Sequence, residues 1–343
     1  SLNERYESDS VTVLSGEWDF KFYEKISRLP GIIDTDNLAC DKISVPSVWQ
    51  RTGYAPPAYI NTRYEFKMNL PGVPEEMMAG VYVKKFTISE NAVNPIITFL
   101  GVCSSLTLYI NGEFVGYSEG SHNPAEFNIA KFVKPGENEL LAIVTQWCNG
   151  TYLECQDMFR DKGIFRDVYI TENPAEYIYD YAVKTSKVDD FYQLSVDVKV
   201  RGENTKNKSL IAELYYKNEK IAEKKCDADR ESFFNFGKLS VKEWNAEKPE
   251  LYTLFISLVE SDKTIQCLRS KIGFKTVKIN GELFTFNGMP IKFKGVNHHD
   301  THEKTGFVMT GEDLLKDILL MKQFNVNAVR TSHYPPDPIF LDL

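Results

Sequence analysis

The stretch Ser105-Leu-Thr-Leu-Tyr-Ile-Asn-Gly-Glu-Phe-Val-Gly-Tyr117 decides the fold class of the first half of the chain. Two runs of β-type residues flank Asn111-Gly112, and this dipeptide is the strongest short signal for a β-hairpin, because both residues tolerate a positive φ. The pattern shows no helical periodicity, so it predicts a β-sandwich or a jelly roll over residues 1–174. Similar short runs, broken by turn residues, lie at 15–23, 62–68, 79–88, 96–100 and 140–147.

A second all-β region follows a turn-like boundary at Asn173-Pro174. Its apolar or alternating runs have strand-like lengths, and its total length of about 100 residues suits an immunoglobulin-like sandwich. We therefore predict such a sandwich over residues 175–276. The runs lie at 177–185, 192–201, 209–216, 233–239 and 251–260.

The pattern changes again in residues 277–343. A hairpin over 283–293, with its turn at Asn287-Gly288, leads into a strand over 292–297. Apolar residues at helical spacing then predict an amphipathic helix over 311–324, and a second strand follows at 327–332. Strand, loop, helix and strand in this order predict the opening of a parallel α/β unit, such as begins a (β/α)8 barrel. We expect this unit to belong to a third domain that continues beyond Leu343, and a short tail is the alternative.

Composition excludes some classes of partner. Net charge is −8, so we expect no nucleic acid partner and no anionic membrane partner, and no apolar run approaches the length of a membrane span. The six cysteines form no C-x-x-C pair, and no apolar leader follows Ser1. We therefore expect free thiols in a reducing, cytoplasmic compartment.

Histidines follow both strands of the barrel segment. Gly295-Val-Asn-His-His-Asp-Thr-His302 comes after the first strand, and Arg330-Thr-Ser-His-Tyr-Pro335 comes after the second. Since parallel strands end at the same rim of a barrel, these side chains are predicted to meet at its catalytic face. Imidazole can donate and accept a hydrogen bond at once, which suits a polyol. A metal held by His298, Asp300 and His302 is an alternative, as are histidines that serve only their loops.

The loop Gly150-Thr-Tyr-Leu-Glu-Cys-Gln-Asp-Met-Phe-Arg160 contributes a third candidate. Gln156 and Asp157 are polar residues in aromatic surroundings. Asp157 can bind sugar hydroxyls or a hard cation through oxygen, or it can simply stabilise its loop. The residues alone favour neither interpretation.

These motifs together resemble family 2 glycoside hydrolases. Val45-Pro-Ser-Val-Trp-Gln50, Tyr59-Ile-Asn-Thr-Arg-Tyr64 and Gly116-Tyr-Ser-Glu119 are similar to the sugar-binding jelly roll of that family. The 152–168 segment, with Gly163-Ile-Phe-Arg-Asp-Val168, resembles more specifically its large bacterial β-galactosidase branch. The histidine motifs resemble the first two β/α units of its barrel.

The resemblance implies a role for each matching residue. Asn61 and Asp157 would reach into the galactose pocket, and Asp157 would also be a sodium ligand. His299 and His333 would hold sugar hydroxyls, whereas Arg330 would be the partner of the nucleophilic carboxylate. The roles of His298 and His302 stay open, and Phe159 stands where the family pattern has tryptophan.

The resemblance also implies a retaining cleavage of terminal β-D-galactose by two glutamates about 5–5.5 Å apart. We expect both glutamates beyond Leu343, so the chain alone should be inactive. Sodium and magnesium would serve the full-length enzyme, which we expect to be a homo-oligomer acting on lactose-type galactosides. A β-glucuronidase or β-mannosidase of the same family, and a non-catalytic carbohydrate-binding module, are the alternatives.

Overall fold

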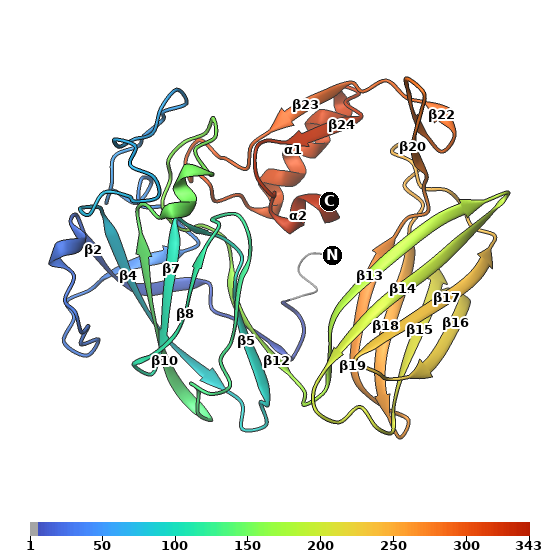
Figure 1. Ribbon diagram of the computed structural model, residues 1–343, viewed down its shortest axis with the longest axis horizontal. Coiled ribbons are helices and arrows are strands. Elements are labelled where there is room, and N and C mark those ends of the chain that lie inside the picture. Colours follow the sequence, from blue (N-terminus) through green and yellow to red (C-terminus); the bar gives the residue numbers. More distant parts are fainter. Residues whose placement is uncertain (1–5) are drawn as a thin grey trace. The chain divides into compact units, whose positions relative to one another are not determined.

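The computed structural model describes residues 6–343 and is mostly β (Figure 1). Its contacts divide the chain into two compact units. Among the described residues, unit 1 holds 6–172 and 295–343, and unit 2 holds 173–294. Thus the end of the chain packs with its beginning, whereas residues 277–294 group with the central sandwich. The mostly β fold class predicted from the sequence is confirmed.

Two antiparallel sheets and one short strand pair build the first part of unit 1. Their inward-facing residues, among them Trp18, Tyr82 and Phe99, form one buried core, as expected of a jelly roll. The six-stranded sheet has the order β3 (Asp41–Val45), β2 (Gly16–Tyr23), β4 (Ala79–Ile88), β10 (Gly136–Thr145), β7 (Ser105–Ile110) and β8 (Glu113–Glu119). The four-stranded sheet has the order β1 (Val11–Val13), β12 (Val168–Asn173), β5 (Asn94–Phe99) and β9 (Ala125–Asn128), and the short pair joins β11 (Gly163–Ile164) to β6 (Val102–Cys103).

The predicted hairpin is present as β7 and β8, with Asn111 and Gly112 both at positive φ. The strand predicted over residues 62–68 is wrong, because this segment forms no strand. Its aromatic side chains pack on other loops instead: the ring of Phe66 lies 4.9 Å from that of Trp147, and the ring of Tyr64 lies 5.0 Å from that of Tyr152. Side-chain packing, rather than a strand ladder, therefore accounts for the aromatic alternation. The 3₁₀ turns η2 (Ile26–Arg28) and η3 (Asn149–Tyr152) also lie in the described part of this region.

Unit 2 is a β-sandwich around a separate core that includes Tyr192, Leu254 and Phe274. Its three-stranded sheet has the order β13 (Tyr177–Val188), β14 (Phe191–Arg201) and β17 (Glu231–Leu239). The opposing sheet has the order β16 (Glu219–Asp227), β15 (Lys208–Tyr216), β18 (Tyr252–Glu260) and β19 (Lys263–Ile272). A small sheet of β20 (Val277–Asn280), β21 (Leu283–Phe286) and β22 (Met289–Pro290) carries the second predicted turn at Asn287-Gly288.

The last segment of unit 1 forms the predicted strand–helix–strand arrangement. Strands β23 (Gly295–His298) and β24 (Ala328–Thr331) are parallel and are joined through helix α1 (Gly311–Gln323), and α2 (Pro338–Asp342) follows. Thr310 caps α1 by accepting from the backbone N–H of Asp313. The first strand begins three residues later than predicted and includes His298. On α1, Leu314 is buried whereas Leu319 and Leu320 are exposed.

Candidate functional site

The parallel strands β23 and β24 bring the two histidine loops together. Asn297 pairs with Arg330 and His298 with Thr331 in the strand register, so His299 and His333 follow at the same end. The centroids of the two imidazole rings lie 5.5 Å apart, with the ring planes at 83°. The predicted proximity of these histidines is therefore present in the structure.

A cavity of about 230 Å³ lies where the first histidine loop meets the 150–160 loop of the jelly roll. Both loops belong to unit 1. This cavity is therefore the candidate ligand site, with one wall from each loop. Its lining consists of Tyr59, Asp157, Met158, Phe159, His299, Thr301, Phe307 and Tyr334.

Asp157 presents an oxygen-rich wall of this cavity. The Tyr59 hydroxyl donates a hydrogen bond to Asp157 Oδ1, which leaves Oδ2 for a ligand. Because this bond stabilises the protonated phenol, the pKa of Tyr59 is raised. Asn61 lies behind Tyr59, and its Nδ2 group donates to the Tyr59 hydroxyl over 3.3 Å. Asn61 is thus connected to Asp157 through Tyr59 but does not line the cavity.

His299 faces Asp157 across the cavity as a neutral imidazole. Partial burial lowers the pKa of His299, and the neighbouring His333 lowers it further. The Nδ1 atom of His299 lies 3.2 Å from the Tyr334 hydroxyl. If Nδ1 accepts from this hydroxyl, Nε2 carries the proton and is the donor offered to a ligand. A cavity with a carboxylate on one side and a neutral imidazole on the other suits a ligand rich in hydroxyl groups.

Arg330 and His333 are exposed beside this cavity rather than within its lining. The Arg330 guanidinium donates through Nη1 to Asn297 Oδ1 over 3.3 Å. Arg330 is thus held at the rim near the histidines. The role expected for it, pairing with a carboxylate of the reaction, stays a prediction.

The alternative of a metal at His298, Asp300 and His302 is not supported. His298 is buried, with Nε2 3.0 Å from Asp317 Oδ2, and Asp300 pairs with Arg166. His302 forms a backbone bridge with Gly306 in its own loop. Within the described residues 6–343, no cluster of three His, Cys, Asp or Glu side chains could hold a metal ion. For sodium, Asp157 offers one free carboxylate oxygen, so other oxygens would have to complete the coordination.

The largest feature that sequence reasoning missed is the role of Arg166. This side chain is 4% exposed, and its Nη2 donates to Asp300 Oδ2 at 3.1 Å and to the Pro335 carbonyl at 2.9 Å. Its Nη1 donates to the His122 carbonyl over 3.1 Å. One guanidinium from the jelly roll therefore binds both loops that carry His299 and His333. In the sequence, Arg166 is one of two adjacent charged residues in Gly163–Val168, and nothing there indicates its partners.

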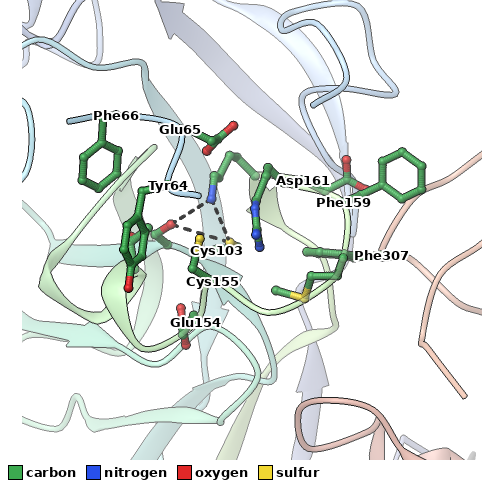
Figure 2. A pocket seen from close by; sticks show the side chains of 14 residues that line it. Tyr64, Glu65, Phe66, Cys103, Glu154, Cys155, Phe159, Asp161 and Phe307 are labelled. Atoms are coloured by element: carbon green, nitrogen blue, oxygen red, sulfur yellow. Dashed lines mark hydrogen bonds between the residues drawn. The ribbon is translucent and has the colours of Figure 1, made fainter. Parts of the chain in front are cut away.

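A second, smaller cavity is lined largely by side chains of the 150–162 loop (Figure 2). Its volume of about 20 Å³ is room for roughly one water molecule, which excludes a sugar. Lys162 Nζ donates to Ser104 Oγ over 3.2 Å and lies 3.6 Å from Cys103 Sγ (Figure 2). Phe159 and Phe307 line both cavities. This region therefore supports the candidate site and is not itself the site.

Comparison with known proteins identifies the family. Three models of glycosyl hydrolase family 2 match in series: the sugar binding domain at residues 11–174, a central family 2 domain at 176–275, and the TIM barrel domain at 277–343. The chain belongs to glycosyl hydrolase family 2. The match to a sugar-binding domain indicates a carbohydrate ligand for this family 2 chain. No helix among residues 6–343 is long and apolar enough to cross a membrane.

Curated relatives of this family 2 chain extend over its whole length. It is 40% identical over 343 residues to a β-galactosidase of Staphylococcus xylosus, covering 99% of this chain and 33% of the relative. It is 38% identical over 347 residues to a β-galactosidase of Actinobacillus pleuropneumoniae, again covering 99% and 33%. The chain thus spans about a third of the length of these relatives.

Solved structures show the same fold. A β-glucuronidase from Ruminococcus gnavus, in complex with D-glucaro-d-lactam, matches with a TM-score of 0.78 at 22% identity, covering 97% of this chain and 57% of that one. The apo structure of the same enzyme gives the same TM-score and identity. At this identity the likeness concerns the family 2 fold alone.

Proposed function

We propose that this chain provides the sugar-binding part of a retaining β-galactosidase, which cleaves terminal β-D-galactose from lactose-type galactosides. The observation that carries the proposal is the chemistry of the 230 Å³ cavity. Asp157 and neutral His299 line it, and none of its described lining residues is Lys or Arg. A neutral sugar can bind there through its hydroxyl groups, and the high identity to β-galactosidases supports galactose as that sugar.

The same cavity argues against a glucuronidase of the same family. A glucuronide would bring its carboxylate towards Asp157, and like charges at close range repel each other. Among the described lining residues, no Lys or Arg side chain offsets this repulsion. The fold shared with the Ruminococcus gnavus enzyme does not alter this argument. A shared fold is a similarity of the backbone, whereas the argument concerns the side chains that line the cavity.

The remaining parts of the proposal concern the whole protein. The acid/base and nucleophilic glutamates would lie outside this chain, so the chain alone should not hydrolyse galactosides. Arg330, at the rim of the cavity, would hold the nucleophile in its charged form through hydrogen bonds. Asp157 would contribute one ligand to sodium, and magnesium would bind elsewhere in the protein. Homo-oligomer assembly and a cytoplasmic location complete the proposal, and the six free cysteines agree with a reducing compartment.

The test compares substrates on the full-length protein. Hydrolysis of 4-nitrophenyl β-galactoside should exceed that of the matching glucuronide and mannoside, and proton NMR should show the β-anomer of galactose as the first product. The 343-residue chain is the matched control and should release no nitrophenol. Faster cleavage of the glucuronide, or α-galactose as the first product, would contradict the proposal.

A further inference from the structure

A third cavity, lined by groups that could form hydrogen bonds with a sugar, lies in unit 2, whereas the candidate site lies in unit 1. It has a volume of about 250 Å³, close to the lower end for small-ligand sites. Its lining residues belong to β13, β14 and β17. These three strands form one sheet (Figure 1). The side chains that matter are Lys184, Ser186, Gln193, Ser195, Phe233 and Asn235.

The strand register explains why these side chains meet. Lys184 pairs with Ser195 across β13 and β14, and Ser195 pairs with Asn235 across β14 and β17. Side chains of directly paired residues lie on the same face of a sheet, so these three form a polar row. A bulge between Gln193 and Ser195 interrupts the β14–β17 ladder beside this row. Such irregularities re-aim side chains and open space on a sheet face.

The one charged residue among the described lining residues of this cavity, Lys184, is already paired with a carboxylate. Lys184 Nζ lies 2.8 Å from Asp197 Oδ2, so its ammonium group has a carboxylate partner. No other described lining residue carries a charge. The cavity is therefore suited to a neutral ligand rather than to an anion or a cation.

The uncharged groups supply donors and acceptors. In the described part of the chain, the side chains of Ser186, Gln193 and Ser195 have no hydrogen-bond partner within the protein. Asn235 Oδ1 accepts from the Gly237 backbone N–H over 2.8 Å, so Asn235 offers a ligand its amide N–H groups. Several hydroxyl and amide groups on one surface match a ligand with several hydroxyls.

Phe233 supplies an apolar surface in the same cavity. Phe233 is 57% exposed, so its ring is accessible to a ligand. A pyranose ring has one face of C–H groups that can pack on an aromatic ring, while its hydroxyls point outward to polar partners. From the polar row and this ring together, we propose that the cavity on β13, β14 and β17 is a second carbohydrate-binding site for a neutral sugar unit.

The site would hold an oligosaccharide without taking part in its cleavage. The site requires no residue of unit 1, so this proposal can be tested independently of the proposed function. Removal of the Phe233 ring should weaken binding, whereas changes to the unit 1 cavity should leave it intact.

NMR titration of the isotope-labelled 343-residue chain tests this proposal, with lactose and cellotriose as neutral probes and trigalacturonic acid as the charged probe. We expect saturable shifts in residues 184–195 and 233–235 with a neutral probe. Phe233→Ala should weaken this binding about tenfold. Phe191→Ala is the matched control, because Phe191 is 40% exposed near the start of β14 but lies outside the cavity lining, and it should change the affinity by less than about twofold.

Asp157→Asn serves as the second control and should leave the unit 2 shifts unchanged. The proposal is overturned if no neutral probe gives saturable shifts there, or if trigalacturonic acid binds more tightly than both neutral probes. It is also overturned if binding survives Phe233→Ala, or if the unit 2 shifts disappear in Asp157→Asn. Circular dichroism of each variant confirms that loss of binding is not loss of folding.

Discussion

Replacing Arg166 by Met should detach the barrel segment from the jelly roll. The change keeps much of the side-chain volume but removes the partner of Asp300, whose side chain is 5% exposed. Removing one partner of a buried ion pair typically costs about 3–5 kcal/mol, because the remaining charge is left uncompensated. Carbonyl groups of His122 and Pro335 also lose their donor, so we expect a loss at the upper end of that range.

Urea denaturation followed by hydrogen exchange and mass spectrometry measures this loss unit by unit. With a slope of about 3 kcal/mol per M, the midpoint of unit 1 should fall by roughly 1–2 M. Protection should be lost first in residues 296–301 and 331–337, while unit 2 keeps its midpoint. Lys42→Met provides the surface control: its ion pair with Asp19 spans 2.8 Å but is about half exposed, so its loss should cost less than about 1 kcal/mol.

The double variant Arg166→Met with Asp300→Asn separates charge from packing. The Asp337 backbone N–H lies 2.7 Å from Asp300 Oδ2, and an asparagine side chain at position 300 can still accept from it without carrying a charge. The double variant should therefore regain part of the stability that Arg166→Met loses. The assignment of Arg166 as the link between the jelly roll and residues 295–343 would be refuted by either of two results: Arg166→Met alone costs less than about 1 kcal/mol, or it destabilises both units equally.

Three further outcomes follow from the site and its supports. Asp157→Asn in the full-length protein should lower kcat/KM about 10²-fold or more and weaken sodium activation with little change in Tm, whereas an unstable but fully active variant would remove Asp157 from the site. Burial holds the pKa of His122 well below its usual 6.5, so the contribution of His122 to the stability of unit 1 should be present above that pH and be lost as pH falls; in urea titrations His122→Phe should flatten this part of the pH dependence, and an unchanged slope would contradict it. Hydrogen exchange should show weaker protection in β23, α1 and β24 than in the jelly roll, since Leu319 and Leu320 are exposed; equal protection would disprove it.

Local sequence signals predicted the elements whose structure is set locally. The Asn111-Gly112 and Asn287-Gly288 turns were predictable because each residue has the positive φ that these residue types tolerate. Helix α1 was predictable from its apolar spacing. Strands β16 and β19 were not identified, because β16 is mostly exposed and its charged residues hide the alternation of an edge strand.

Long-range contacts could not be predicted in the same way. Arg166 and Asp300 are 134 residues apart, and nothing local to either residue indicates the other. Tyr59, which holds Asp157, was likewise missed, because an exposed tyrosine in a loop has no periodic signature. The residues indicated by the family resemblance lie in or near one cavity. Asp157 and His299 line it, whereas Arg330 and His333 lie outside its lining. Asn61 is connected to Asp157 only through the Tyr59 hydroxyl.

The Arg166 contacts restrict how modular these domains can be in protein engineering. A chimera that takes its jelly roll from one relative and its barrel from another would place its crossover near residue 174 or 277, where the family models meet. Such a crossover separates Arg166 from Asp300 and Pro335, although the Arg166 guanidinium donates hydrogen bonds to both. Recombination at these points therefore requires parents that match at both ends of the network, or a compensating substitution in the transferred barrel.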